Sequence, residues 1–314
     1  MSILRSIRWM AWTEKFVLVF VISFAFYTTL PIKTTRTLLV PQGSISHIIS
    51  QLTQKGYALS PIDTYILVFL GKPQSGWVDI GATSLNRIDF LYKLTTAKAK
   101  MEEITLIPGE TTELFLASVT KELKLSKSKL ETYYKEFSHY PEAGIYADTY
   151  YVPYGIGEKH LMYFLLDESS KKYKEISKKV YGSYREKQWL EILIIASIIQ
   201  KEAANTEEMA LVSSVIYNRL NKGMALQMDG TLNYGPYSHI KVTPERIQND
   251  TSRFNTYKYK GLPLSPVGTV SLDALKAAMK PAKTNYLYFM KNSQGFHDFT
   301  ATYEEHRQNI KRVR

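Results

Sequence analysis

The stretch ASIIQKEAANTEEMALVSSVIYNRL, residues 196–220, places an acid where the apolar face of a helix would continue. A nearly unbroken apolar pattern runs from Trp189 to Ile199, which predicts a buried helix. Glu202 follows three residues after Ile199 and four after Ile198, so it extends the same helix face. The fold must therefore bury this helix, and the carboxyl group of Glu202 then lies at the end of a buried helix.

A second helix is predicted directly after this one. Asn205 and Glu208 have the spacing of a capping box, in which each side chain satisfies a free backbone N–H at the start of the next helix. Gly223 is well placed to end that helix. Its apolar face comprises Leu211, Val212, Val215, Ile216 and Leu220. Two helices are thus expected to meet at a turn beside Glu202.

Two physical effects disfavour the anion of a glutamate in this position. Burial removes water from the charged form, and the end of a helix presents unpaired carbonyls with negative partial charge. Both raise the pKa of Glu202, and a carboxyl that stays protonated near neutral pH can donate a proton to a leaving oxygen. The alternative is a structural or solvated glutamate just past an apolar run, and the residues alone leave both interpretations open.

Composition narrows the class of protein. The 314 residues are 45% apolar and 22% charged, which is typical of a folded chain. A formal charge of +11 favours an anionic partner, such as nucleic acid, anionic lipid or an acidic cell-wall polymer. The absence of cysteine excludes disulfides, zinc–thiolate sites, iron–sulfur clusters and thiol nucleophiles.

Common catalytic motifs are missing from the sequence. There is no G-x-S-x-G, no Walker-type GK[ST] and no H-E-x-x-H pair, so a zinc hydrolase is disfavoured. His297 stands beside Asp298 and could form a ligand pair with it, but a hydrogen-bonded structural histidine is the more common case.

The N-terminus combines basic residues with an uncharged apolar run. Arg5, Arg8 and Lys15 precede FVLVFVISFAFYTTLPI, residues 16–32, whose length is at the short end of the roughly 17 to 25 residues that span a bilayer. We expect residues 16–32 to be an uncleaved transmembrane anchor. The expected localisation is the inner membrane, crossed once.

This anchor predicts a topology and has two competitors. Residues 1–15 would form a cytoplasmic tail, and everything after Lys33 would be exported. A cleaved signal peptide is one alternative, because the strongest apolar core, Phe16 to Phe26, has signal-peptide length. A buried helix of a soluble protein is the other.

The exported part reads as alternating strands and helices. After the anchor come a strand, a Pro-Gly turn, a helix capped by Ser44 or Ser46, and a turn at Gly56. Another helix and strand follow, which completes a small α/β module ending near residue 103. The order of strand, Pro-Gly turn, Thr cap and helix then recurs in EEITLIPGETTELFLASVTKELKLS.

Several ordered motifs together resemble the YceG-like group of endolytic murein transglycosylases. They are EAGIYADTYYVP, SIIQKEA, VSSVIYNRLNKGMALQMDGTLNYG, NTYKYKGLP, SLDALKAAMKP and YLYFM…GFHDFTATYEEH, which cover nearly the whole chain in the family's order. The sequence departs from the family pattern at Ala143 and Ala147, at Gly230 where proline is expected after Asp229, and in the loop at Leu264, Ser265 and 269–271.

The resemblance implies an α+β fold and a set of site residues. It implies a small LysM-like α/β subdomain at residues 34–103 and a larger α+β catalytic domain at residues 104–314. Glu202 aligns with the catalytic glutamate of the family. The positions expected around the substrate cleft are Gln227, Asp229, Asn255 and Tyr257.

The resemblance also implies an activity. Such an enzyme cleaves the β-1,4 bond between N-acetylmuramic acid and N-acetylglucosamine within glycan strands and leaves 1,6-anhydro ends. It needs no metal and no organic cofactor. The implied partners are peptidoglycan glycan strands, the membrane through the N-terminal helix, and peptidoglycan synthases.

Three alternatives belong to other functional classes. A membrane-anchored, non-catalytic glycan-binding scaffold would tolerate the loss of Glu202. A lysozyme-like hydrolase would need a second carboxylate, for which Asp229 is the first candidate. A nucleic-acid-binding membrane protein would explain the charge of +11, but the sequence has no nucleic-acid motif, and the topology would place its binding domain on the wrong side of the membrane.

Overall fold

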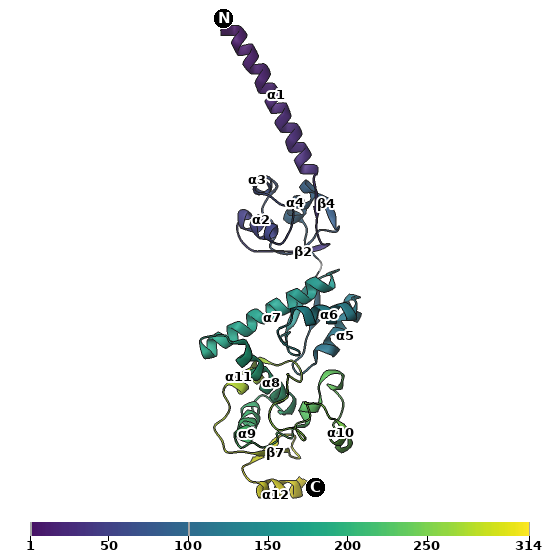
Figure 1. Cartoon of the computed structure of the whole chain (residues 1–314), viewed down its shortest axis with the longest axis vertical. Coiled ribbons are helices and arrows are strands. Elements are labelled where there is room, and N and C mark those ends of the chain that lie inside the picture. The colour runs from purple at the N-terminus through teal and green to yellow at the C-terminus, as the bar shows by residue number, and fades with distance from the viewer. Residues whose placement is uncertain (1, 100, 314) are drawn as a thin grey trace. The chain divides into compact units, whose positions relative to one another are not determined.

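The chain folds into two compact units (Figure 1). The computed structural model describes residues 2–99 and 101–313, with side chains between Trp12 and Arg312. The first unit comprises Met1–Glu102 and Tyr151–Ile156, and the second comprises Glu103–Tyr150 and Gly157–Arg314. Helices alternate with short two-stranded sheets throughout, which confirms the mixed α+β class. The subdomain boundaries at 34–103 and 104–314 stay predictions.

The chain begins with a long helix, α1, Ser2–Thr29. Within the described residues, no helix combines the length and the apolarity required to cross a membrane. The expected segment 16–32 is also not one helix, because α1 ends at Thr29 and strand β1, Pro31–Lys33, follows. Ile32 is fully buried in the core of the first unit. The transmembrane anchor is therefore not shown, and the end of the predicted segment belongs to a folded domain.

The rest of the first unit packs three helices against two small sheets. β1 pairs antiparallel with β4, and β2 pairs antiparallel with β3. The elements are β2 Thr37–Val40, α2 Ile45–Gln54, α3 Pro61–Leu70, β3 Gly76–Asp79, β4 Ser84–Asn86 and α4 Arg87–Thr96. Ser44 caps α2 by accepting a hydrogen bond from the N–H of His47, as one of the two expected caps. The LysM-like character of the first unit stays a prediction.

A buried ion pair fixes the end of α1 to this unit. Asp63 and Arg87 lie 2.6 Å apart, with side chains 0% and 7% exposed. Tyr27 of α1 donates its hydroxyl to Asp63 at 3.1 Å, and its ring lies 4.2 Å from the Arg87 guanidinium. A buried charge pair persists only when its remaining hydrogen bonds are satisfied, so Tyr27 completes the pair and is held by it.

The second unit is mainly helical. It contains the antiparallel pair β7 and β8, whereas the residues of the paired strands β5 and β6 are divided between the two units. The helices are α5 Thr112–Leu123, α6 Lys127–Phe137, α7 Glu158–Tyr181, α8 Glu186–Glu202, α9 Met209–Asn221, α10 Pro244–Asn249, α11 Leu272–Met279 and α12 Tyr303–Val313. The strands are β5 Met101–Thr105, β6 Thr149–Pro153, β7 Tyr288–Lys291 and β8 His297–Thr300, and two short 3-10 helices are η1 Asp229–Leu232 and η2 Gly235–Tyr237.

Helix α8 is the centre of the second unit. Every residue from Ile192 to Ile199 is buried, so the helix is covered around its whole circumference and not only on one face. α9 and α11 both pack against it. A helix that is apolar all round is stable only inside a core. This burial makes α8 a rigid support, and Glu202 is its last residue.

Candidate active site

Glu202 lies where the buried helix α8 leaves the core. Its side chain is half-buried, because the chain turns away at Ala203, which adopts an extended conformation. Burial raises the pKa of the Glu202 carboxyl to about 7, a hydrogen bond from Gly230 opposes this shift, and the nearby charge of Asp229 adds to it. A carboxyl with this pKa is available in both protonation states near neutral pH.

The backbone of Gly230 contacts the Glu202 carboxyl directly. The Gly230 N–H donates to Oε1 of Glu202 at 2.6 Å. Gly230 itself is buried in η1, and a Cβ atom there would lie 2.6 Å from Cβ of Lys201 and 2.9 Å from Oε1 of Glu202. Any side chain at this position would require η1 or the end of α8 to shift. A proline at this position would also remove the N–H donor.

Buried hydroxyl groups hold η1 in place. Thr231 donates its hydroxyl to the carbonyl of Met228 at 2.7 Å, and the Met228 N–H donates to the hydroxyl of Thr256 at 3.1 Å. The two threonine hydroxyls lie 3.0 Å apart, and both residues are buried. Buried hydroxyls are stable only when paired, so these bonds fix the segment that carries the Gly230 N–H.

Asp229 and Tyr257 form a polar pair beside Glu202. Tyr257 donates its hydroxyl to Oδ1 of Asp229 at 2.7 Å. The Asp229 side chain is exposed, whereas Tyr257 is half-buried. Burial, the hydrogen bond to Asp229 and the charges of Asp229 and Glu202 raise the pKa of Tyr257, so its hydroxyl stays protonated and acts as a donor.

Gln227 and Asn255 occupy different environments. Gln227 is exposed, has a φ of 50°, and donates its N–H to the carbonyl of Thr256 at 3.1 Å. Asn255 is fully buried. Its side-chain amide donates to the carbonyls of Ile247 and Asp250, both at 2.8 Å.

These contacts divide the four residues expected around the cleft into those with side chains near Glu202 or in solvent and one, Asn255, whose side chain is buried in a loop. Asp229 and Tyr257 lie together near Glu202, and Gln227 presents an exposed side chain one residue before the Met228 that supports η1. The amide of Asn255 is used by backbone carbonyls, and its Oδ1 accepts the N–H of Tyr257 at 3.1 Å. Asn255 thus shapes the loop that carries Tyr257.

Arg219 is a site residue that the sequence did not single out. It is buried on α9, and burial lowers the pKa of its guanidinium. It donates to the carbonyls of Leu287 at 2.6 Å and Leu226 at 2.5 Å, and its charge favours the carboxylate form of Glu202. An arginine on a helix usually extends into solvent, so only the motif VIYNRL contained a signal for it.

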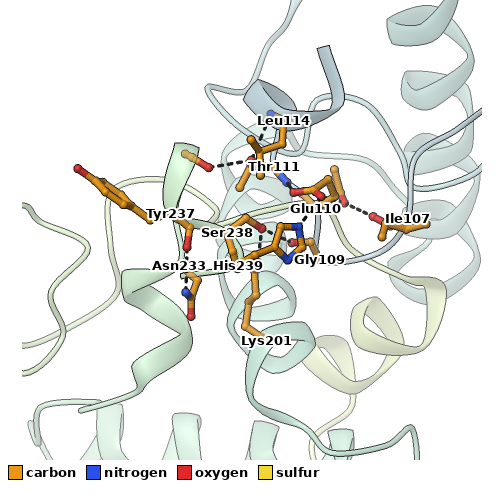
Figure 2. A network of polar contacts seen from close by, with 12 residues as sticks. Ile107, Gly109, Glu110, Thr111, Leu114, Lys201, Asn233, Tyr237, Ser238 and His239 are labelled. Carbon is orange, nitrogen blue, oxygen red and sulfur yellow. Dashed lines mark hydrogen bonds and ion pairs between the residues drawn. The ribbon is translucent and has the colours of Figure 1, made fainter. Parts of the chain in front are cut away.

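A second polar network holds the segment that follows η1 (Figure 2). Lys201 donates to Oγ of Ser238 at 2.8 Å, and His239 lies 2.8 Å from Oε2 of Glu110. Thr111 donates its hydroxyl to the carbonyl of Gly235 at 2.9 Å. These contacts join η2 to the end of α8 and to the start of α5.

The turn after Glu202 is held by a different pair. The Glu208 N–H donates to Oδ1 of Asn205 at 3.0 Å, which is one half of the predicted capping box. The Glu208 carboxylate instead accepts from the N–H of Ala204 and lies 2.7 Å from Nδ1 of His297. His297 is therefore a hydrogen-bonded structural histidine, and Asp298 accepts separately from Asn292 at 2.9 Å. Among the described residues, no three His, Asp or Glu side chains cluster in a way that could hold a metal ion.

Comparison with known proteins identifies the family of this chain. A model of the YceG-like family matches residues 38–312, so this chain belongs to the YceG-like family. It is 28% identical over 309 residues to an endolytic murein transglycosylase of Bacillus subtilis strain 168, covering 87% of this chain and 83% of that protein.

Two further comparisons agree with this assignment. The chain is 29% identical over 232 residues to an endolytic murein transglycosylase of Streptococcus pneumoniae strain D39, covering 67% of this chain and 42% of that longer protein. The crystal structure of a putative YceG-like protein from Listeria monocytogenes superposes with a TM-score of 0.55 at 26% identity, covering 88% of this chain and 99% of that one.

Proposed function

We propose that the protein is a peptidoglycan lytic transglycosylase that cuts within glycan strands. Family membership supports this reaction class, as do the names of the relatives from Bacillus and Streptococcus. The observation that carries the proposal is the Glu202 carboxyl, which sits at the end of a buried helix, accepts the Gly230 N–H at 2.6 Å and has its pKa raised to about 7 by burial.

The bond proposed to break is the β-1,4 link from N-acetylmuramic acid to N-acetylglucosamine. Protonated Glu202 donates its proton to the glycosidic oxygen, which leaves with the electron pair of its bond to C1. Positive charge then develops at C1 of the muramoyl residue. The exposed Asp229 carboxylate is suited to stabilise that charge, and Gln227 to hold the sugar.

The same carboxyl then completes the reaction as a base. The Glu202 carboxylate removes the proton of the C6 hydroxyl of the same muramoyl residue, and O6 forms the new bond to C1. One C–O bond breaks, one forms, and the proton returns to Glu202, so the product is a 1,6-anhydro end and no water is consumed. A pKa near the working pH suits a group that serves first as acid and then as base.

The Gly230 N–H has a matching role in this cycle. A hydrogen bond to the charged form of a carboxyl favours that form. The Gly230 N–H therefore stabilises the Glu202 carboxylate between the first proton transfer and the deprotonation of the C6 hydroxyl. Because the donor is a backbone group fixed by buried threonines, its position does not depend on a flexible side chain.

Analysis of the products in heavy-oxygen water tests this mechanism. Purified murein is incubated with the protein in H₂¹⁸O, and the fragments are measured by mass spectrometry. An attacking hydroxyl tethered to the reacting centre has an effective concentration of roughly 10⁵ M or more, against about 55 M for water. Fragments should therefore carry unlabelled anhydro ends and should have mixed lengths early in the reaction.

The other outcomes identify the alternatives. Labelled reducing ends would show a lysozyme-like hydrolase, for which Asp229 is the first candidate for the second carboxylate. Glycan binding without any cleavage would show a non-catalytic scaffold. Glycan binding by the first unit is compatible with both the hydrolase and the scaffold.

We further propose that α1 attaches the protein to the cytoplasmic membrane, with the second unit outside the cytoplasm. The basic N-terminal flank and the apolar residues from Phe16 to Phe26 support this orientation. In that location the enzyme would end the elongation of nascent strands near peptidoglycan synthases. The topology can be tested with reporters fused after Arg314. Activity of a reporter that works only outside the cytoplasm would support the topology, and activity of a strictly cytoplasmic reporter would contradict it.

A further inference from the structure

The first unit has an apolar surface that extends beyond α1. On α3, Ile62, Tyr65, Val68 and Phe69 all project into solvent, and the Phe69 and Tyr65 side chains are 91% and 76% exposed. Exposed apolar residues that are scattered singly need no explanation, but four on one ten-residue helix form a patch. We call these four residues the α3 patch.

The α3 patch is continuous with the apolar part of α1. Phe20, Phe24 and Tyr27 of α1 and Ile62, Tyr65 and Phe69 of α3 line one hollow of about 730 Å³. Figure 1 shows α3 on the side of the first unit from which α1 projects. Because Tyr27 is bound to the Asp63–Arg87 pair, the end of α1 is held next to α3.

The exposure pattern of α1 indicates what covers this surface. Consecutive residues Phe16, Val17, Leu18, Val19 and Phe20 are between 60% and 71% exposed, so apolar side chains point outward on all sides of the helix. A helix that is apolar all round must be covered all round. A single protein partner covers one side, whereas lipid surrounds the whole helix.

The length of the apolar part of α1 explains why a second apolar element is needed. Phe16 to Phe26 is eleven residues, or about 17 Å of helix. The hydrocarbon core of a bilayer is about 30 Å thick. A short apolar helix is accommodated by local thinning of the bilayer and by flanking residues whose side chains reach the membrane interface. The α3 patch supplies such a flank.

The charges around the patch fit a lipid surface. The only acid of α3 is Asp63, which is fully buried against Arg87 and therefore not presented to lipid. Lys72 follows the helix and is exposed, where it can meet anionic headgroups. A tyrosine and a phenylalanine on a helix with a basic end are the residues expected at a membrane interface.

We propose that the α3 patch is a membrane seat, which holds the first unit in the headgroup and upper acyl region of the bilayer beside α1. Lipid chains fill the hollow between α1 and α3. The consequence for function is positional, because a unit fixed at two points on the membrane cannot swing freely about α1. The proposal rests on the proposed attachment through α1 but not on the cleavage chemistry.

The absence of native cysteine allows a direct test. Full-length variants Phe69→Cys, Val19→Cys and Gln42→Cys are labelled with a polarity-sensitive fluorophore and reconstituted in vesicles of phosphatidylcholine and phosphatidylglycerol. Spin-labelled lipids then quench any probe that lies in the bilayer. Gln42 is the control because it is an exposed polar residue in the turn between β2 and α2.

The membrane seat predicts strong quenching and a blue-shifted emission at positions 69 and 19, and neither effect at position 42. Adding Tyr65→Asp to the Phe69→Cys variant should reduce quenching at 69 several-fold. Tyr92→Asp is the matched control, since Tyr92 is an exposed aromatic residue on α4 outside the hollow, and it should leave quenching unchanged.

Each remaining outcome is decisive. Quenching at 19 with a water-exposed probe at 69 overturns the seat while keeping the attachment. Quenching at 69 with a water-exposed probe at 19 overturns the attachment through α1, and with it the proposal, because the seat is defined as a second contact beside α1. Protection of position 69 without any lipid, together with a dimeric mass, would show that a second copy covers the patch and would overturn the proposal. Murein cleavage by the Tyr65→Asp variant in detergent should equal that of the unchanged chain.

Discussion

The backbone N–H of Gly230 donates to Oε1 of Glu202 at 2.6 Å, although the two residues are 28 positions apart. The contact joins the last residue of the buried helix α8 to a four-residue 3-10 helix. It places a backbone donor on the carboxyl of Glu202, whose pKa burial raises to about 7. The following predictions depend on this pair and on the groups around it.

Replacing the acid should abolish cleavage without unfolding the protein. Glu202→Gln keeps the size of the side chain and an oxygen that accepts the Gly230 N–H, but it has no proton to transfer. We expect a loss of at least about 10³-fold in the rate of murein cleavage, near the range for removal of a general acid. Circular dichroism should be unchanged. Full activity of this variant would remove Glu202 from the mechanism.

The same variant should be more stable than the unchanged chain, and the difference should grow with pH. The folded pKa of Glu202, about 7, lies above the ordinary value of 4.5, so the folded state binds the proton more tightly. The unchanged chain therefore loses stability as pH rises from 4.5 through about 7, and glutamine does not. Thermal unfolding at pH 5 and pH 8 should show a gain on the order of 1–3 kcal/mol at the higher pH only. An equal gain at both pH values would contradict a raised pKa.

Removing the neighbouring charge should shift the pH profile. The Asp229 carboxylate raises the pKa of Glu202, so Asp229→Asn should lower it. Because the first step needs protonated Glu202, the alkaline limb of kcat/KM should move to lower pH, while kcat at the optimum falls less than in Glu202→Gln. Asp273→Asn, on the exposed face of α11, is the control. A loss equal to that of Glu202→Gln would favour a two-carboxylate hydrolase.

A single methyl group at Gly230 should displace the acid. The added Cβ in Gly230→Ala would lie 2.6 Å from Cβ of Lys201, so η1 or the end of α8 must shift. We expect a loss of one to two orders of magnitude in kcat, as for a misplaced catalytic group. Gly223→Ala tests strain without crowding, since it has a positive φ of 62° and open space around its Cβ position. It should lose stability but keep the pH profile.

The network in Figure 2 should act on the rate through position rather than through chemistry. Lys201→Met removes the donor to Ser238, which lies eight residues after Gly230 in the same segment. We expect a several-fold loss of kcat with a changed pH limb, because the Gly230 N–H is held less firmly. Lys222→Met, at the exposed end of α9, is the matched control. Unchanged kinetics in Lys201→Met would show that η1 is fixed by its threonines alone.

Local sequence patterns determined several helices of both units. The apolar run before Glu202, the Pro-Gly turns and the caps Ser44 and Thr111 act within a few residues, so periodicity and capping chemistry predict them. Burial of Glu202 and the direction of its pKa shift also followed from its place at the end of an apolar helix. The proposal of a catalytic role for Glu202, over a structural or solvated one, rests on the order of motifs along the chain.

Tertiary packing decided which distant groups meet the acid. The contacts of Glu202 with Gly230, the burial of Arg219 and the use of the Asn255 amide by backbone carbonyls join residues that no local pattern relates. The same holds for the N-terminal segment. Its apolar run continues from Thr29 to Ile32 in the sequence, but α1 ends at Thr29 and Ile32 is buried in the core of the first unit. Hydrophobicity records how apolar a residue is but not what covers it. Whether lipid or a protein core covers a side chain is determined only when the chain has folded.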